Sequence, residues 1–265
     1  MAHNIGQMFY VGELPWHTLG QKLKQAATLE EALVAQGLDW TKFTRQEMRS
    51  VVCANCHVEY YFAGEGKYLT FPWENGTSIE GIEQYYTENQ FTDWTHPDSG
   101  AAMVKMQHPD YELFSAGSTH YKAGVACADC HMPYTRDGAA KFSSHDVKSP
   151  LLEPSKTCAA CHTNVEYVVD RAKTIQKQVN DTMIAAEDAI LEAITAIKAA
   201  AENDNVDASL LAEARALHRR AQLRWDFIAA ENSMGFHNPE EALRILATAT
   251  DLARQAQIKA IQAVP

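Results

Sequence analysis

The sequence predicts a mainly α-helical chain, in which an irregular region rich in aromatic residues is followed by long C-terminal helices. Three observations lead to this prediction. Apolar residues recur at spacings of three and four after residue 164, whereas residues 58–126 show no regular apolar period. The six cysteines fall into three pairs, and a histidine directly follows each pair. We expect three regions, namely residues 1–42, 43–163 and 164–265.

The first 42 residues read as a segment of their own. A capping-box pattern, Thr28 with Glu31, predicts a short helix that ends near Gly37. Residues 1–21 contain no apolar run of the about 7–15 residues that a secretory signal needs, so we expect no export signal in the chain as written. The strings VGELPWHTLG and TLEEALVAQGLDW resemble the N-terminus of a phage- and plasmid-borne protein family of unknown function. A fusion near residues 40–43 and an unusual native N-terminus would each explain this segment.

Each cysteine pair belongs to a Cys-x-x-Cys-His motif, the spacing that attaches a c-type haem. The two thiols form thioethers with the vinyl groups of one porphyrin, and the adjacent histidine ligates its iron. Structural zinc would need two close Cys-x-x-Cys knuckles or a paired histidine motif, and neither a disulfide framework nor a thioredoxin-type motif explains a histidine after every pair. The sequence therefore predicts a multihaem cytochrome c with three haem c sites: Cys53, Cys56 and His57; Cys127, Cys130 and His131; and Cys158, Cys161 and His162.

Haems with two histidine ligands need a further histidine on the distal side of each iron. The chain has eleven histidines, and eight remain after the three motif histidines are set aside. This surplus is typical of multihaem proteins. The candidates are His3, His17, His96, His108, His120, His145, His218 and His237.

The irregular region, residues 58–126, contains glycine, proline, asparagine and aromatic residues throughout. This composition is typical of a region in which porphyrins replace much of the apolar core. We expect its aromatic side chains to pack on the haem rings or on one another, namely Phe71, Trp73, Tyr85, Tyr86, Phe91 and Trp94.

Three long helices are expected in the last hundred residues. The first runs from residue 165 to about 201, and the turn at residues 203–207 separates it from a second helix that begins at Asp207 and continues through Ile228. Asn238 and Pro239 then form a strong helix start, with the asparagine as N-cap, and this third helix continues to about Ala263. Long helices with apolar stripes usually form a bundle within one chain or a seam between two chains.

Composition excludes two kinds of partner. The formal net charge of −11 and the pI near 5.4 argue against a nucleic acid, because phosphate binding needs clustered Lys and Arg. A membrane span needs about 18 consecutive apolar residues, and no stretch of the sequence approaches this length. We therefore expect no membrane-spanning helix.

Several strings extend well beyond the haem motifs: residues 53–62, 71–73, 105–109, 127–133, 224–226 and 236–244. Through them, the chain from about residue 43 to its end resembles the C-terminal half of the pentahaem, ammonia-forming cytochrome c nitrite reductase. The resemblance implies the six-electron reduction of nitrite to ammonium in the periplasm, with electrons from a quinol-linked or cytochrome donor. It also implies a homodimer whose interface is built from the long helices.

The resemblance also indicates what is missing from these residues. The family's catalytic haem has a proximal lysine from a Cys-x-x-Cys-Lys motif, and no such motif occurs in this sequence. The three motifs present match the family's third, fourth and fifth haems. Two alternatives therefore stay open: a trihaem electron-transfer protein without catalysis, and a fusion product that holds no haem.

Site residues follow from the resemblance position by position. His108 and Tyr60 match the family's active-site histidine and tyrosine, whose hydrogen bonds act on nitrogen–oxygen groups at the iron. A calcium site is implied at Glu59 and Gln107 through side-chain oxygens, and at Tyr60 and Lys105 through backbone carbonyls. Such an all-oxygen set suits a hard cation.

The resemblance also implies the distal haem ligands. His120 matches the distal ligand of the third-motif haem, and His237 matches that of the second-motif haem. His145 matches the distal ligand of the family's second haem, for which this chain has no motif, and the first-motif haem would take its distal ligand from the missing half. His96 and His218 match no ligand, and we expect them at the surface.

Overall fold

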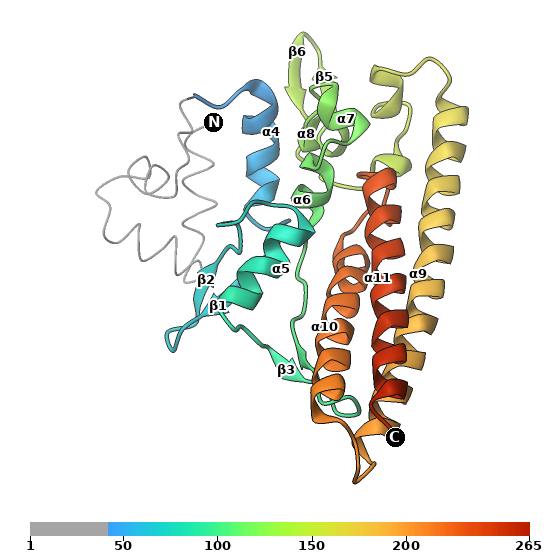
Figure 1. The fold of residues 1–265 in the computed structure, drawn as a ribbon. Helices are drawn as coiled ribbons and strands as arrows, with labels where there is room; N and C mark the ends of the chain where they lie inside the picture. Colours follow the sequence, from blue (N-terminus) through green and yellow to red (C-terminus); the bar gives the residue numbers. More distant parts are fainter. Residues whose placement is uncertain (1–41) are drawn as a thin grey trace. The chain divides into compact units, whose positions relative to one another are not determined.

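The structure, a computed structural model, describes residues 42–265 (Figure 1). The short helix expected near Thr28, and nearly all of the expected segment 1–42, lie outside the described residues. The described chain is mainly helical, which confirms the predicted fold class. It divides into two compact units. Unit 1 holds the described residues up to Phe71 together with Thr119–Val169, and unit 2 holds Pro72–Ser118 and Asp170–Pro265.

Unit 1 is assembled from short elements and contains all three Cys-x-x-Cys-His motifs. Two antiparallel hairpins pair Phe62 with Leu69 and Thr135 with Phe142. Its elements are α4 (Arg45–Ala54), β1 (Tyr61–Ala63), β2 (Tyr68–Thr70), α7 (Thr119–Lys122), α8 (Cys127–His131), β5 (Tyr134–Asp137), β6 (Ala140–Ser143), and the 3₁₀ helices η2 (Pro150–Leu152) and η3 (Cys158–Ala160).

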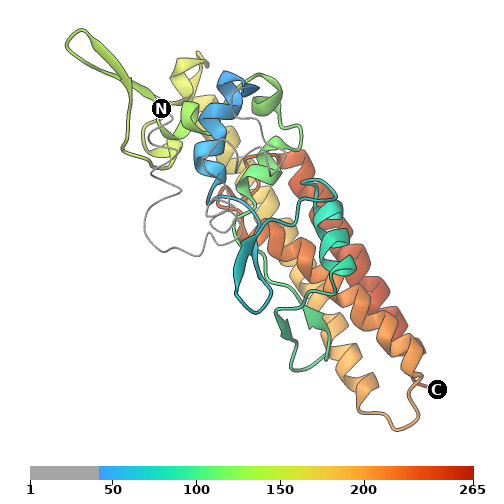
Figure 2. The same cartoon turned by 90° about the vertical axis from the view of Figure 1, so that its left-hand side faces the viewer.

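Unit 2 is dominated by long helices. Its elements are α5 (Ile79–Glu88), β3 (Trp94–Thr95), β4 (Ala102–Met103), α6 (Asp110–Ser115), α9 (Val165–Ala201), α10 (Ala208–Ala230) and α11 (Pro239–Gln262), with the first turn of α9 counted in unit 1. The last three helices lie side by side in both views (Figures 1 and 2). Among the described residues, no helix combines the length and the apolar character that a membrane crossing requires.

The three long helices confirm the sequence prediction closely, because their ends are set by local signals. Asp207 caps α10, where its carboxylate accepts the N–H groups of Ser209 and Leu210 at 2.9 and 3.1 Å. Asn238 caps α11, with Pro239 in the first turn and acidic residues facing the positive end of the helix dipole.

The core between α9, α10 and α11 is rich in alanine. Ala189, Ala193, Ala214, Ala253 and Ala256 are each 0% exposed and belong to one apolar cluster. Side chains this small let helix axes approach closely, so the three helices make a thin, dense core.

Residues 72–118 are more regular than the sequence indicates. Helix α5 is capped by Ser78, whose hydroxyl accepts the N–H of Gly81 at 3.2 Å, and it buries Ile79, Ile82 and Tyr86. A helix of ten residues gives too few turns for its apolar period to stand out among the surrounding turn residues. As expected, aromatic side chains pack on one another here, with the rings of Tyr86 and Phe91 stacked at 5.3 Å.

The sequence predicted His218 at the surface, and this prediction is wrong. The residue is fully buried in α10. Its Nε2 faces Gln222 Oε1 at 3.1 Å, and its Nδ1 faces Ser99 Oγ at 3.0 Å. The ring of His96 lies edge-on at 5.2 Å. These partners suit a neutral ring that donates to Gln222 and accepts from Ser99, and burial, with the nearby His96, lowers the pKa of His218 to about 4.

This buried histidine is expected to make the described fold less stable in mild acid. In the unfolded chain the ring gains a proton below its ordinary pKa of 6.5, whereas in the fold it stays neutral down to about 4. The unfolded state therefore binds more protons between these values, and stability falls as the pH falls from 6.5, by on the order of 3 kcal/mol in total. Urea unfolding at pH 7 and pH 5, followed by helix circular dichroism, measures the loss. His218→Gln should lose less over the same interval, and an equal loss in both proteins would contradict this account.

Candidate functional site

All three cysteine motifs adopt one helical turn. The His57 N–H donates to the carbonyl of Cys53 at 2.9 Å, and the His162 N–H donates to that of Cys158 at 2.9 Å. The second motif is itself helix α8. Positions i, i+3 and i+4 lie on one face of such a turn, so each motif presents two thiols and an imidazole on the same side.

The first two motifs are joined by an ion-pair clamp. Arg45 and Arg49 of α4 reach the carboxylate of Asp129 in α8 at 2.7 and 3.0 Å. Although burial opposes ionisation, the Arg45 hydrogen bond and the N–H of Ala126 hold the pKa of Asp129 below its ordinary value. The clamp brings the Cys53 thiol within hydrogen-bonding distance of Cys127, and this contact, with burial, raises the pKa of Cys53 well above its usual range. The arginine partners were missed in the sequence, because Asp129 occupies a variable position of its motif.

The third motif lies close to the second. Burial raises the pKa of the Cys130 thiol to about 11, with further contributions from Cys158 and Cys161. The Thr157 hydroxyl anchors the turn before Cys158 by bonding to the carbonyls of Pro150 and Glu153 at 2.9 and 3.1 Å. All six cysteines lie in the described part of the chain, and none forms a disulfide.

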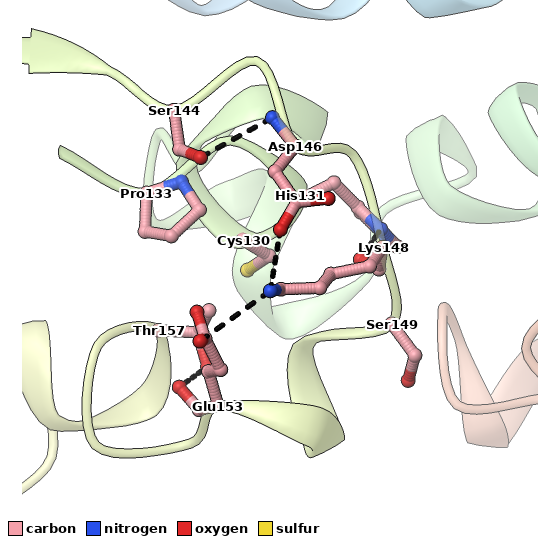
Figure 3. A pocket seen from close by; sticks show the side chains of 9 residues that line it. All are labelled: Cys130, His131, Pro133, Ser144, Asp146, Lys148, Ser149, Glu153 and Thr157. Carbon is pink, nitrogen blue, oxygen red and sulfur yellow. Dashed lines mark hydrogen bonds and ion pairs between the residues drawn. The ribbon is translucent and has the colours of Figure 1, made fainter. Parts of the chain in front are cut away.

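A small pocket beside the second motif shows how a proximal histidine is oriented (Figure 3). His131 Nδ1 lies 3.0 Å from the backbone carbonyl of Lys148, an acceptor, so Nδ1 carries the proton and Nε2 is left for a metal. The Lys148 ammonium in turn bridges Asp146 at 2.6 Å and Glu153 at 3.4 Å, which fixes the loop that supplies the carbonyl.

The structure brings His120 and His162 together, the two histidines that the resemblance assigns to the third-motif haem. Their ring centroids are 6.2 Å apart, and the ring planes are nearly perpendicular at 88°. With metal–nitrogen bonds of about 2 Å and roughly 1 Å from Nε2 to the ring centre, two imidazoles on opposite sides of one iron have centroids roughly 6 Å apart. The spacing of these two rings therefore fits an iron between them.

The expected calcium and active-site residues are divided between the two units. In unit 1, Glu59 is 0% exposed, and Tyr60 packs edge-on against Phe62 at 5.9 Å. Burial, with the nearby Glu59, raises the pKa of the Tyr60 phenol, so this side chain keeps its proton at neutral pH. In unit 2, residues 105–108 belong to no helix or strand, the Lys105 N–H donates to Asp93 at 2.9 Å, and His108 is exposed.

The remaining expected ligands lie in ordinary loop positions. His145 is exposed after strand β6, and His57 is exposed after α4. His237 is partly buried between α10 and α11, where Asp110 and Glu231 face its Nδ1 at 3.5 and 3.3 Å. No sequence pattern points to these two carboxylates, since Asp110 is more than a hundred residues away and Glu231 matches no motif.

Comparisons with known proteins find relatives over most of the chain. The sequence pattern of the family described as "Cytochrome c552" matches residues 17–265, a match that begins within the segment 1–42. Cytochrome c-552 of Bacteroides fragilis is 46% identical over 231 residues, which cover 87% of this chain and 46% of that protein. The cytochrome c nitrite reductase subunit NrfA of Nitratidesulfovibrio vulgaris is 40% identical over 257 residues, which cover 89% of this chain and 49% of that protein.

A solved structure is similar as well. The catalytic subunit NrfA of cytochrome c nitrite reductase from Desulfovibrio desulfuricans, described with two calcium sites, superposes with a TM-score of 0.81 at 39% identity. The superposition covers 90% of this chain and 54% of that one. The chain thus spans about half the length of the curated relatives it matches. Since the family pattern covers nearly all of its residues, the chain belongs to the cytochrome c552 family.

Proposed function

We propose that these residues form the haem-binding C-terminal half of an ammonia-forming nitrite reductase, with three covalent haem c sites and part of a calcium site. The observation that carries this proposal is the pairing of His120 and His162 at 6.2 Å, with the third cysteine motif directly preceding His162. The likeness to NrfA over most of the chain supports the assignment to nitrite.

When bound, the haems supply irons that accept and pass on single electrons. The chain's own residues hold and orient them: each motif turn presents two thiols beside its histidine, and the Lys148 carbonyl fixes the tautomer of His131. The contact of Cys53 with Cys127 supports close spacing of the first two haems, a spacing that suits electron transfer from a quinol-linked or cytochrome donor.

In this proposal, Tyr60 and His108 donate hydrogen bonds and protons to the substrate. Reduction of nitrite to ammonium consumes six electrons and eight protons and releases two waters. A phenol with a raised pKa stays protonated and can donate a hydrogen bond to a nitrogen–oxygen group, and an exposed imidazole can exchange protons with solvent. We assign Glu59, Tyr60, Lys105 and Gln107 to calcium, because their carboxylate, amide and backbone oxygens are the donors this ion prefers.

We also propose a homodimer through the long helices, in the periplasm. Four large aliphatic side chains stay exposed on α9 and α11, between 50% and 62% of their surface, where a second copy could cover them. These are Ile184, Leu191, Ile258 and Ile261.

The haem content tests the proposal. The full chain, exported behind a secretion leader in a host that matures c-type cytochromes, is expected to carry three haems in the pyridine haemochrome assay. Replacing Cys158 and Cys161 together by alanine should lower the count to two, because both thioethers of one haem are lost. A chain without covalent haem would contradict the proposal.

A second candidate, a trihaem electron-transfer protein, is favoured by the absence of a Cys-x-x-Cys-Lys motif from the sequence. Nitrite-dependent oxidation of reduced viologen, with ammonium measured as product, separates the two. The 265 residues alone are expected to form little ammonium, and enzyme-like rates would overturn this second candidate.

A further inference from the structure

The loop between α10 and α11 places two carboxylates against one imidazole. Nδ1 of His237 lies 3.3 Å from Glu231 Oε2 and 3.5 Å from Asp110 Oδ1. The Glu231 side chain is 0% exposed, whereas that of His237 is 22% exposed. A carboxylate this deeply buried needs hydrogen-bond donors to offset its loss of water, and the surrounding loop supplies them.

Glu231 is held firmly by its own loop. Its Oε2 accepts the N–H and the hydroxyl of Ser233 at 2.9 and 2.7 Å, and its Oε1 accepts the N–H of Gly235. The Ser233 hydroxyl also accepts the His237 N–H at 2.8 Å, which ties the backbone of the histidine to the same turn. The carboxylate and the imidazole are therefore fixed relative to each other.

Two further contacts make this loop rigid. Gly235 has φ +76°, and a Cβ there would come within 2.6 Å of Val179 Cγ2, so the chain passes too close to α9 for any larger residue. Asp110 accepts the backbone and side-chain N–H groups of Asn232, both at 2.8 Å, and so joins the loop to α6. The loop is pre-organised around the ring of His237.

We propose that Glu231, with Asp110 beside it, is a positioning residue that accepts a hydrogen bond from the Nδ1–H of His237, so that Nε2 is the nitrogen that would ligate a haem iron. This rests on the proposed function and on the ligand assignment that the family resemblance implies, in which His237 would be the distal ligand of the second-motif haem. A carboxylate acceptor makes imidazole a more basic ligand and stabilises ferric iron, so the midpoint potential of this haem is lowered.

The two ligands assigned to this haem thus differ in their supports. His131 Nδ1 donates to the neutral carbonyl of Lys148, whereas His237 Nδ1 faces a carboxylate. Of these two acceptors, only the Glu231 carboxylate carries a negative charge. Replacing it by an amide removes that charge and so measures its effect on the iron.

Spectroelectrochemical titration of the haem-loaded chain tests the proposal. Glu231→Gln is expected to raise the midpoint potential of one haem and to leave those of the others unchanged. At a fixed applied potential, the ratio of reduced to oxidised form of that haem should rise about tenfold, which corresponds to about 59 mV for one electron. Glu240→Gln, which removes the same charge from an exposed position at the start of α11, should leave every potential unchanged. Glu231→Asp keeps the charge and should shift the potential less, and it serves as the test if the glutamine variant does not load with haem.

Three outcomes would overturn the proposal. One is an unchanged potential in both Glu231 variants, and another is an equal shift in Glu240→Gln. The third is a divalent ion bound in stoichiometric amount and lost in Glu231→Gln, because the cluster would then be a metal site in its own right. His237→Ala separates this inference from the proposed function: a haem that stays low-spin in that variant contradicts the ligand assignment, whereas a high-spin haem with no effect of Glu231→Gln contradicts the positioning role alone.

Discussion

Replacement of His120 by alanine is expected to convert one of the three haems from low spin to high spin. His120 and His162 face each other at a ring separation that fits an iron between them. Two imidazole ligands keep haem iron low-spin, and the loss of one leaves an open or water-bound position. Electron paramagnetic resonance of the oxidised protein measures the change, which should affect about one third of the haem because one of three sites is altered. Added imidazole should restore the low-spin signal by filling the position left by the side chain.

His145→Ala is the matched control for this experiment. His145 is an exposed histidine in the same unit, and the family resemblance matches it to the ligand of a haem for which these residues carry no motif. Its removal should leave the haem spectra unchanged. The assignment of His120 would be wrong if its variant kept every haem low-spin, and a new high-spin signal in the control would reveal that His145 has been recruited as a ligand.

Replacement of Glu83 by alanine is expected to lower the free energy of unfolding by about 3–5 kcal/mol. The Glu83 carboxylate of α5 accepts hydrogen bonds from the guanidinium groups of Arg224 at 2.7 Å and Arg220 at 2.6 Å, both on α10. The Arg224 side chain is only 3% exposed, and its other carboxylate partner, Glu80, lies farther away at 3.9 Å, so its buried charge would be poorly compensated. Chemical denaturation followed by circular dichroism measures the loss.

The pH dependence of this contact has a definite sign. Burial opposes ionisation, but the hydrogen bonds from Arg224 and Arg220 prevail and lower the pKa of Glu83. A carboxyl group with a lowered pKa adds stability above its ordinary value of 4.5, and this stability is lost as the pH falls through the lowered value. Below that pH, the difference in the free energy of unfolding between the wild type and Glu83→Ala should therefore shrink. Glu88→Ala, an exposed glutamate on the same helix, is expected to cost at most about 0.5 kcal/mol, and an equal cost in both variants would refute the role of the ion pair.

The helices of the C-terminal third could be predicted because their signals are local. The spacing of apolar residues along α9, and the caps Asp207 and Asn238, act within one or two turns of the chain. The haem motifs are local as well, since two cysteines and a histidine within five residues share one helical turn whatever surrounds them. Helix α5 escaped prediction because it is short, and its burial depends on α10.

By itself, the sequence determined the chemistry that this protein can hold: three cysteine motifs with their histidines, and the long helices that follow. Only the tertiary structure decided how those groups are supported. It joins Arg45 and Asp129, buries His218 against Ser99, and sets Asp110 and Glu231 against His237. Most of these contacts connect residues separated by about 80 to 130 positions, and the others depend on how a loop closes on itself, so no spacing in the sequence can reveal them. The physical reason is that such contacts form only when packing has already brought the elements together.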